Sequence, residues 1–570
     1  MSNNLESSLP GMQELKAALK SAANNLFSVE VEPELTRPEE QFGDFATNIA
    51  LQLAKQLGKN PREVAEAIVD KLKNLPILAD VQIAGPGFIN LRLTDETLAK
   101  MAFFATKLPK PYATQEIVIE YSDPNPFKIL HVGHLYTSVV GDAISNLFSN
   151  YGANVHRVNF GGDVGLHAAK TIWSIIQKLG GEHPDKLLEV PIDQRAQWMA
   201  EEYVAGSLAY GDDERIDGEI KELNKKIYQI HERQDKTSPL AKIYWITRQW
   251  SYDYFEEFYK RFNALGFEKY YPESVTVEPG MKAVKENTGK VFEESEGAIV
   301  FKGEVHNMHT RVFINSQGLP TYETKDVGLI LKKWEDFHFD RSIVITGNEI
   351  YEYMQVVLKA VEQFAPELVQ KTTHITHGLV KLAGGVKMSS RLGNIVSANS
   401  VLEMARHANK EINKQDNEDT ALGAIKYSFL KQRLGADLIY DPAESVSLEG
   451  NSGPYLQYAH ARACSILLKA NFQEQSLETA KADGLEASER SLARKIGEYP
   501  EVVAKASDEL MPHHICTYLY ELAQSFNSFY EKNRVLDNAR QNIRLRLVKA
   551  YADVLKNGLN LLNIASPDKM

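Results

Sequence analysis

Two histidines three residues apart, His131 and His134, stand where the pattern changes from a short apolar run to a helical one. If a helix begins there at the carboxyl end of a strand, its free N–H groups and positive dipole end face outward, and both imidazoles add donors on that side. Gly133 leaves room for an adenine or a ribose against the backbone. The segment predicts a site for a nucleotide triphosphate. The alternative for an isolated pair is ordinary surface or helix-capping histidines.

A second segment far downstream, Lys387-Met-Ser-Ser-Arg391, lies between glycines. A lysine on such a loop can reach the β- and γ-phosphates as charge builds on departing pyrophosphate. Ser389, Ser390 and the N–H groups around Met388 would donate hydrogen bonds there. Each segment is a weak signal alone, but the pair in this order around one sheet favours nucleotide chemistry over surface histidines.

These residues need a scaffold, and the strand and helix patterns predict one. An apolar, β-branched run at 116–121 has strand length, and a helical pattern follows from about Val132. Further strand candidates alternate with long helical patterns at 154–160, 311–315, 342–346 and 373–377. This alternation is typical of an α/β fold with a Rossmann-like parallel sheet covered by helices. Residues 184–271 are predicted to form a helical insertion.

Other patterns flank this α/β region. Near the N-terminus, helical segments precede an alternating stretch at 81–93, which predicts a small α+β domain. Near the C-terminus a single-face apolar stripe predicts a helix bundle, formed by Ile515, Leu519, Leu522, Phe526 and Phe529. We therefore expect three domains, at residues 1–107, 113–410 and 411–570.

Composition narrows the class of protein. The chain has 570 residues, 43% of them hydrophobic, and a formal net charge of −12. No apolar run approaches the roughly 18 residues of a membrane span, and the acidic balance excludes a generally basic nucleic-acid-coating protein. One local basic face can still bind RNA, because counterion release depends on the contacts made.

The cysteines and the N-terminal residues indicate the cellular compartment to expect. Cys464 and Cys516 are too few for a disulfide framework and form no CxxC motif, which disfavours zinc and dithiol chemistry. The first 36 residues contain no Arg and no long apolar core, so we expect neither a transit peptide nor a secretory signal. We expect the protein to be a monomer and to act in the cytoplasm.

The two chemical segments resemble the HIGH and KMSKS signatures of class I aminoacyl-tRNA synthetases, and three further runs narrow the resemblance to the arginyl family. Residues 120–128, Glu-Tyr-Ser-Asp-Pro-Asn-Pro-Phe-Lys, resemble its E(F/Y)SSPNxxK run, and 159–165 resemble N-x-x-G-D-x-G. Residues 322–328 are similar to its Y-x-(T/A)-(R/K)-D-(I/L/V)-G motif. Runs at 42–45, 85–91, 452–465 and 567–570 resemble its N-terminal and anticodon-binding domains.

The resemblance implies a two-step reaction, in which arginine and ATP give arginyl-adenylate and tRNA(Arg) then takes the arginyl group. His131 and His134 would bind the triphosphate and Lys387 the leaving pyrophosphate. Lys128 matches a lysine that serves the phosphates in relatives with a degraded KMSKS loop. Magnesium would arrive with ATP, and no metal held by the protein is expected.

The resemblance also implies an arginine pocket and a tRNA surface. The expected arginine-binding residues are Glu120, Ser122, Asn125, His131, Tyr322 and Asp326, with the carboxylates on the guanidinium fork and Asn125 on the α-amino and carboxylate groups. The expected tRNA-binding residues are Phe42, Tyr458, Arg462 and Met570. For Tyr458 and Arg462 the alternative is core packing and a surface ion pair.

Arg391 follows the KMSS residues where the family signature often has Lys or Thr nearby, and the segment at 347–353 also departs from the family pattern. Residues 347–353 lack the Gln and His that members often use to hold the substrate backbone, and Glu349, Glu352 and Gln355 stay open as substitutes. Other hypotheses are another class I synthetase, a non-catalytic tRNA-binding paralogue and a nucleotidyltransferase with an HxGH motif. The match at Tyr322 to Asp326 and the missing zinc motif disfavour the first, the intact motifs disfavour the second, and the C-terminal bundle disfavours the third.

Overall fold

The structure is a computed structural model that describes residues 12–211, 213–383, 396–473 and 484–570. Its contacts divide the chain into two compact units, residues 112–446 and residues up to 111 together with those from 447 onward. This division falls after Val446, whereas the sequence placed the start of the bundle at residue 411. The expected three-domain limits stay a prediction.

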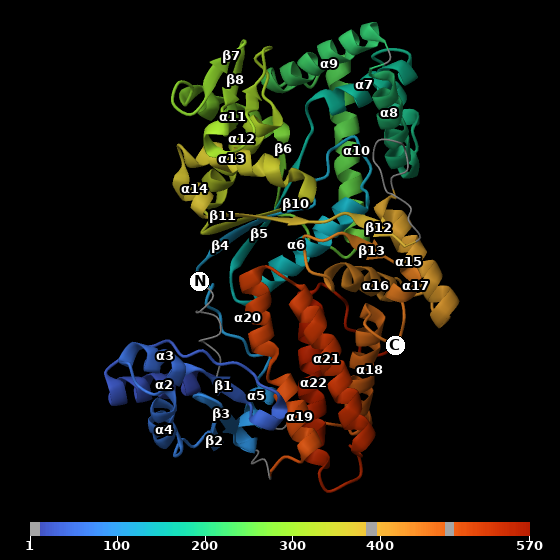
Figure 1. Cartoon of the computed structure of the whole chain (residues 1–570). Coiled ribbons are helices and arrows are strands. Elements are labelled where there is room, and N and C mark those ends of the chain that lie inside the picture. Colours follow the sequence, from blue (N-terminus) through green and yellow to red (C-terminus); the bar gives the residue numbers. More distant parts are fainter. Residues whose placement is uncertain (1–11, 212, 384–395, 474–483) are drawn as a thin grey trace. The chain divides into compact units, whose positions relative to one another are not determined.

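A parallel sheet organises the 112–446 unit. Its strands follow the order β11 (Thr372–His377), β10 (Arg341–Gly347), β4 (Glu116–Glu120), β5 (Asn154–Gly161) and β6 (Lys269–Pro272), and every neighbouring pair is parallel. The central strand β4 is buried along most of its length, as expected for a sheet covered on both faces. The predicted Rossmann-like α/β architecture is confirmed (Figure 1).

One predicted strand belongs elsewhere. The segment expected at 311–315 forms β9 (Arg311–Ile314), which pairs antiparallel with β8 (Ala298–Phe301) and, through it, with β7 (Glu293–Ser295). Its assignment to the parallel sheet was wrong. A short apolar run predicts a strand but not its partner, which depends on where the chain returns. The edge strand β6 was missed because it is short and ends in a proline.

Helices on this sheet carry or support the predicted site. α6 (Val132–Asn150) follows β4, α7 (Leu166–Leu179) follows β5, and α11 (Glu273–Glu286) packs along α12 (Tyr322–Phe337). α13 (Tyr351–Glu362) follows β10.

The segment expected as an insertion is helical up to residue 261. It contains α8 (Arg195–Ala209), α9 (Glu214–Glu232) and α10 (Pro239–Arg261), whose apolar faces share a core with α7. Its last predicted residues, 269–271, belong instead to strand β6.

The other unit combines the small N-terminal domain with the bundle. Strands β1 (Phe45–Thr47), β3 (Phe88–Leu93) and β2 (Leu78–Ala84) form an antiparallel sheet beside α2 (Met12–Phe27), α3 (Ile49–Leu57) and α4 (Pro61–Leu72). The bundle consists of α18 (Gly453–Lys469), α19 (Ala487–Ile496), α20 (Tyr499–Glu509), α21 (His513–Lys532) and α22 (Gln541–Leu561). The predicted stripe on α21 is buried throughout.

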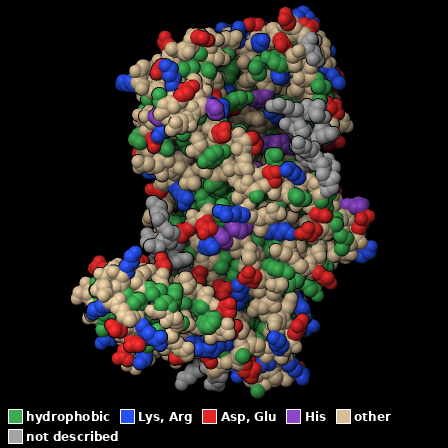
Figure 2. All heavy atoms as spheres, in the orientation of Figure 1, with side chains coloured by type: hydrophobic (Ala, Val, Ile, Leu, Met, Phe, Trp, Pro, Cys, Tyr) green, Lys and Arg blue, Asp and Glu red, His purple; other side chains and the backbone are tan. Residues whose placement is uncertain are grey.

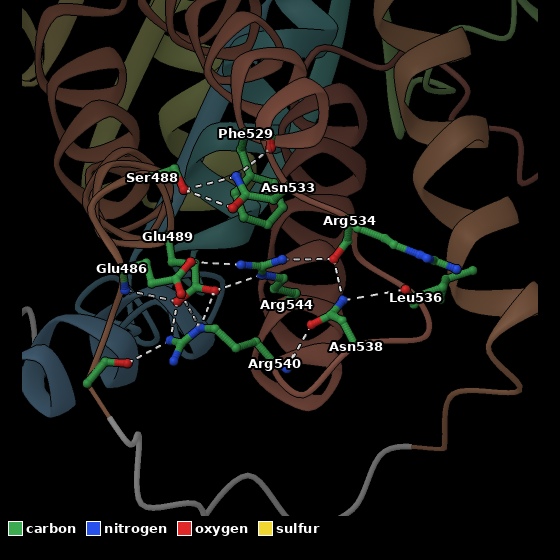
Figure 3. A network of polar contacts seen from close by, with 11 residues as sticks. Glu486, Ser488, Glu489, Phe529, Asn533, Arg534, Leu536, Asn538, Arg540 and Arg544 are labelled. Atoms are coloured by element: carbon green, nitrogen blue, oxygen red, sulfur yellow. Dashed lines mark hydrogen bonds and ion pairs between the residues drawn. The ribbon is translucent and has the colours of Figure 1, made fainter.

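Buried ion pairs join the elements of this unit. Glu489 of α19 accepts hydrogen bonds from Arg540 and Arg544, the latter at 2.8 Å to Nε, which ties α19 to α22 (Figure 3). Arg490, next along α19, pairs with Asp44 and with Asp95 of α5 (Asp95–Phe103). Because burial makes an unpaired charge costly, each contact depends on both partners.

Surface charge is mixed on the face seen in Figure 2, where acidic and basic side chains alternate. The net charge of −12 is therefore not gathered into one field on that face. Among the described residues, no helix is long and apolar enough to cross a membrane.

Candidate active site

The two histidines cap the first turn of α6. His131 is the N-cap residue, and its Nδ1 accepts a hydrogen bond from the Gly133 N–H at 3.1 Å. Nδ1 of His134 accepts from the His131 N–H at 3.2 Å, and the two rings stack with centroids 3.8 Å apart. Capping and ligand binding, which the sequence left as alternatives, are therefore compatible functions of the same side chains.

The capping arrangement fixes the protonation of both rings. Burial lowers the pKa of His131 to about 4, with a smaller contribution from the nearby Lys128 ammonium. Burial also holds the pKa of His134 well below its usual range, and His131 and Lys128 add to the effect. Both imidazoles are neutral at pH 7. Because Nδ1 accepts in each, the proton lies on Nε2, which leaves an Nε2–H donor for a ligand.

Gly133 permits this geometry. A Cβ atom at position 133 would lie 2.9 Å from Cε1 of His131, so any other residue would displace the capping ring. The glycine also lines the cavity described next. The backbone of the first turn is therefore open toward that cavity.

A cavity of about 590 Å³ opens beside the start of α6. Predicted site residues from several elements line it together: Glu120, Ser122, Asn125, His131, Gly133, His134, Tyr322 and Asp326. Parallel strands bring their carboxyl ends to one edge of a sheet, which is why β4, β10 and the loops after them meet here. Segments separated by about two hundred residues in the chain thus share one chamber.

Other predicted site residues lie elsewhere. Lys128 is not among the lining residues, and its ammonium stands 5.1 Å from the centre of the Tyr203 ring. Lys387, Met388, Ser389 and Ser390 lie outside the described residues, so their roles stay predictions.

Buried lysines neutralise some of the acidic groups of the cavity. Glu120 pairs with Lys333, and both side chains are almost completely buried. Glu273 of α11 pairs in the same way with Lys325 of α12. The Lys325 ammonium also stands 4.8 Å from the centre of the Tyr322 ring, which supports that ring at the cavity wall.

Asp326 has no such cation bonded to it within the described part of the chain. It accepts a hydrogen bond from the Tyr353 hydroxyl, and burial raises its pKa to about 8 in spite of that bond. The carboxylate of Glu120 adds to the rise. Arg311 also lines the cavity, but its guanidinium pairs with Glu323 at 3.4 Å, so no cation of the described residues is bonded to Asp326.

Asp123, on the loop after β4, is likewise a carboxylate whose hydrogen-bond donor is a neutral group. One carboxylate oxygen, Oδ1, accepts the Phe160 N–H at 2.8 Å, while burial and the charges of Glu120 and Asp326 hold the pKa of Asp123 well above its usual range. It also lines the cavity. Asp123 stands where the family run quoted above has its second serine.

Neighbouring side chains on this loop are fixed by hydrogen bonds. Oδ1 of Asn125 accepts the Gly162 N–H at 2.6 Å, so the amide group has its Nδ2 end available for a ligand. The hydroxyl of Ser122 lies 2.8 Å from that of Tyr259 and is buried. Ser122 therefore lines the cavity mainly through its position on the loop.

The segment at 347–353, which departs from the family pattern, contributes to the cavity through residues other than the family's Gln and His. Of the three candidate substitutes, Glu349 lines the cavity, whereas Glu352 and Gln355 are not among its lining residues. Tyr353 lines it too, and its hydroxyl donates a hydrogen bond to Asp326.

Sequence reasoning missed several residues of this wall. Asp123, Glu273 and Tyr353 line the cavity, and Lys333 neutralises one of its carboxylates. Asp123 lies within the run at 120–128 that carries the family resemblance. Glu273, Tyr353 and Lys333 lie outside the motifs of the sequence.

Comparison with known proteins adds family evidence to this geometry. Residues 98–441 match the family described as tRNA synthetases class I (R), catalytic domain. Residues 13–93 match the arginyl tRNA synthetase N terminal domain, and residues 456–570 match the DALR anticodon binding domain. The chain belongs to the arginyl-tRNA synthetases.

Full-length relatives agree with this membership. An arginine–tRNA ligase of Bdellovibrio bacteriovorus is 31% identical over 560 residues, covering 94% of this chain and 93% of the relative. The arginine–tRNA ligase of Haemophilus ducreyi is 30% identical over 568 residues, covering 95% and 98%. The solved Thermus thermophilus arginyl-tRNA synthetase superposes with a TM-score of 0.77 at 25% identity, covering 98% of this chain and 100% of that one.

The residues expected at the tRNA surface of an arginyl-tRNA synthetase belong to the other unit. Tyr458 and Arg462 are exposed on α18, one turn apart, and the Arg462 guanidinium lies 4.8 Å from the centre of the Tyr530 ring. Phe42 and Met570 are also exposed. Their exposure leaves all four side chains accessible to a partner.

One group of metal-ligand types occurs in the described part of the bundle: His460, Cys464 and Asp568. The Cys464 sulfur lies 3.5 Å from Nε2 and 3.9 Å from Nδ1 of His460, so it sits beside the ring and not along a nitrogen lone pair. Nδ1 of His460 is 3.0 Å from the Pro567 carbonyl, to which it donates. These contacts are explained by hydrogen bonding that holds the C-terminal residues against α18.

Proposed function

We propose that this chain ligates L-arginine to tRNA(Arg) in two steps, with arginyl-adenylate as the intermediate. The observation that carries the proposal is the single cavity in which two neutral histidine donors at a helix N-terminus face a wall with uncompensated carboxylates. The first feature fits a triphosphate and the second fits a cationic amino acid.

In the first step, the carboxylate of arginine attacks the α-phosphorus of ATP and pyrophosphate leaves. The Nε2–H groups of His131 and His134 donate to phosphate oxygens, and the N-terminus of α6 adds its positive dipole end. Because both rings are neutral, they contribute hydrogen bonds and not charge. Positive charge would be supplied by magnesium that enters with ATP and by Lys387, with Lys128 as the alternative lysine.

Arginine lies against the acidic wall. Asp326 and Glu120 bind the guanidinium group, and the Tyr322 hydroxyl completes the pocket. Glu120 keeps Lys333 as a partner, so Asp326 is the stronger ligand of the two. Asn125 and His131 lie at the α-amino and carboxylate end of the substrate. A pocket of this kind disfavours uncharged amino acids, since their binding would leave its buried acids unpaired.

In the second step a terminal ribose hydroxyl of tRNA takes the arginyl group and AMP is released. We assign tRNA contacts to Phe42 in the N-terminal domain and to Tyr458, Arg462 and Met570 in the bundle. An exposed tyrosine next to an arginine offers stacking and a phosphate contact. We further propose a monomer that acts in the cytoplasm.

ATP–pyrophosphate exchange tests the function directly. The assay is run with each amino acid in turn, with and without tRNA, on the full chain. We expect exchange with arginine and with no other amino acid. Exchange with a different amino acid, or none under any condition, contradicts the proposal. Transfer of labelled arginine to tRNA then tests the second step.

A further inference from the structure

The acidic groups of the cavity outnumber the cations that neutralise them. Within the residues that the structure describes, its lining includes the carboxylates of Glu120, Asp123, Glu273, Asp326 and Glu349. Two of these form buried ion pairs, Glu120 with Lys333 and Glu273 with Lys325. A free amino acid that enters the cavity meets those two as salt bridges already formed.

Apart from the exposed Glu349, the exceptions are Asp326, which is buried, and Asp123, which is half-buried. Each accepts one hydrogen bond from a neutral donor, the Phe160 backbone N–H in one case and the Tyr353 hydroxyl in the other. Lys333 acts on both from a distance, but its ammonium is bonded to Glu120. A buried carboxylate without a bonded cation is costly unless a ligand supplies that cation.

Arginine brings two cations, the guanidinium and the α-ammonium group. Asp326, on α12 four residues after Tyr322, belongs to the wall that we assign to the guanidinium. Asp123 belongs to the loop that carries Asn125, and the two side chains accept N–H groups two residues apart at the end of β5, from Phe160 and Gly162. Alternate residues of a strand share an orientation, so Asp123 and Asn125 lie along the same edge.

We propose that Oδ2 of Asp123 binds the α-ammonium group of arginine and that Asp123 is a specificity-determining residue of this site. The assignment rests on the proposed function, since it presumes that arginine is the substrate. Oδ1 is held by Phe160, which leaves Oδ2 as the acceptor for the ligand. A serine at this position, as in the family run, offers a hydroxyl but no charge, so this chain depends more strongly on the α-ammonium group.

The backbone limits which variants are informative. Asp123 has φ 48°, in the left-handed region, where Asp and Asn are better tolerated than most residues. Asp123→Asn keeps that conformation and an oxygen for the Phe160 N–H while it removes the charge. Asp123→Ser provides a second variant with the residue of the family run. Asp253→Asn, an exposed position on α10, is the matched control for the chemical change.

The test is a thermodynamic cycle that combines a substitution in the protein with removal of one group from the ligand. Dissociation constants are measured by calorimetry for L-arginine and for δ-guanidinovalerate, which lacks only the α-amino group. In the wild-type chain and in Asp253→Asn, we expect loss of that group to weaken binding at least about 30-fold, as for a buried charge pair that loses one partner. In Asp123→Asn and Asp123→Ser we expect a penalty of about threefold or less.

The outcomes separate the two proposals. A wild-type chain that neither binds nor activates arginine contradicts the proposed function. Arginine activation with equal penalties for δ-guanidinovalerate in wild type and both Asp123 variants, within about threefold, overturns the role of Asp123 alone. If one variant does not fold, as judged by its thermal unfolding transition, the other decides the result.

Discussion

Replacing Asp326 by Asn removes the charge that we assign to the guanidinium while keeping an acceptor for the Tyr353 hydroxyl. Breaking a buried ion pair costs about 3–5 kcal/mol when the partner charge stays behind. In the empty site, however, the pKa of Asp326 is about 8, so the carboxyl is largely protonated at pH 7. Ionising it there costs about 1.4 kcal/mol, which the wild-type chain must supply on binding.

The two quantities give the expected size of the effect. At pH 7 the net loss is about 1.6–3.6 kcal/mol, or a rise of about 15- to 400-fold in the dissociation constant of arginine. At pH 9 the wild-type carboxylate is already ionised, and the loss grows to about 150- to 5000-fold. Affinity for tRNA should stay within about twofold, because the residues assigned to it lie in the other unit.

The pH dependence supplies a second readout with a definite sign. A bound guanidinium favours the ionised carboxylate, so binding releases a proton from a group whose pKa is raised in the empty site. Wild-type affinity for arginine should therefore rise between pH 6 and pH 8, by up to about tenfold per unit, and then level off. The Asp326→Asn variant should lack the component of this rise that Asp326 contributes.

The assay is calorimetric titration with arginine at pH 6, 7, 8 and 9, with filter binding of tRNA as the control. Asp253→Asn serves as the matched variant. If Asp326→Asn binds arginine at pH 9 within about tenfold of wild type, Asp326 is not the guanidinium ligand. A wild-type affinity that does not change between pH 6 and pH 8 would refute the argument from the raised pKa.

Three further predictions concern the phosphates, the fold and tRNA. Lys387→Ala should lower the single-turnover rate of adenylate formation far more than it weakens ATP binding. A wild-type rate with Lys128 intact would show that Lys387 does not bind the leaving pyrophosphate. A double-mutant cycle with Lys128→Ala shows whether the two lysines share this role. Gly141→Ala should destabilise the chain by about 1–3 kcal/mol or more in urea unfolding, because the new methyl group would collide with the Tyr121 ring; unchanged stability would show that α6 can shift. Tyr458→Ala should raise the KM for tRNA about 10-fold, the size expected for the loss of one stacked base, without changing arginine-dependent exchange. An unchanged KM would show that Tyr458 serves packing in the bundle and not tRNA binding.

The motifs and local patterns could be predicted because they depend on neighbours in the chain. The strand at 116–120, the helix that His131 begins and the proline-led helix α4 follow from periodicity and capping residues. The arginyl family followed from runs of residues whose order needs no structure. Strand partners did not follow in the same way, as β9 and β6 show, because pairing is decided by distant segments.

The charge state of the site was decided by the tertiary structure alone. Lys333 neutralises Glu120 across 213 residues, and Lys325 neutralises Glu273 across 52, yet Asp123 and Asp326 receive neutral donors. A sequence shows that an acid is present, but its pKa depends on how deeply it is buried and on which cation the fold brings to it. The sequence therefore determined the family and the reaction to expect, while the folded chain determined which carboxylates remain for the substrate.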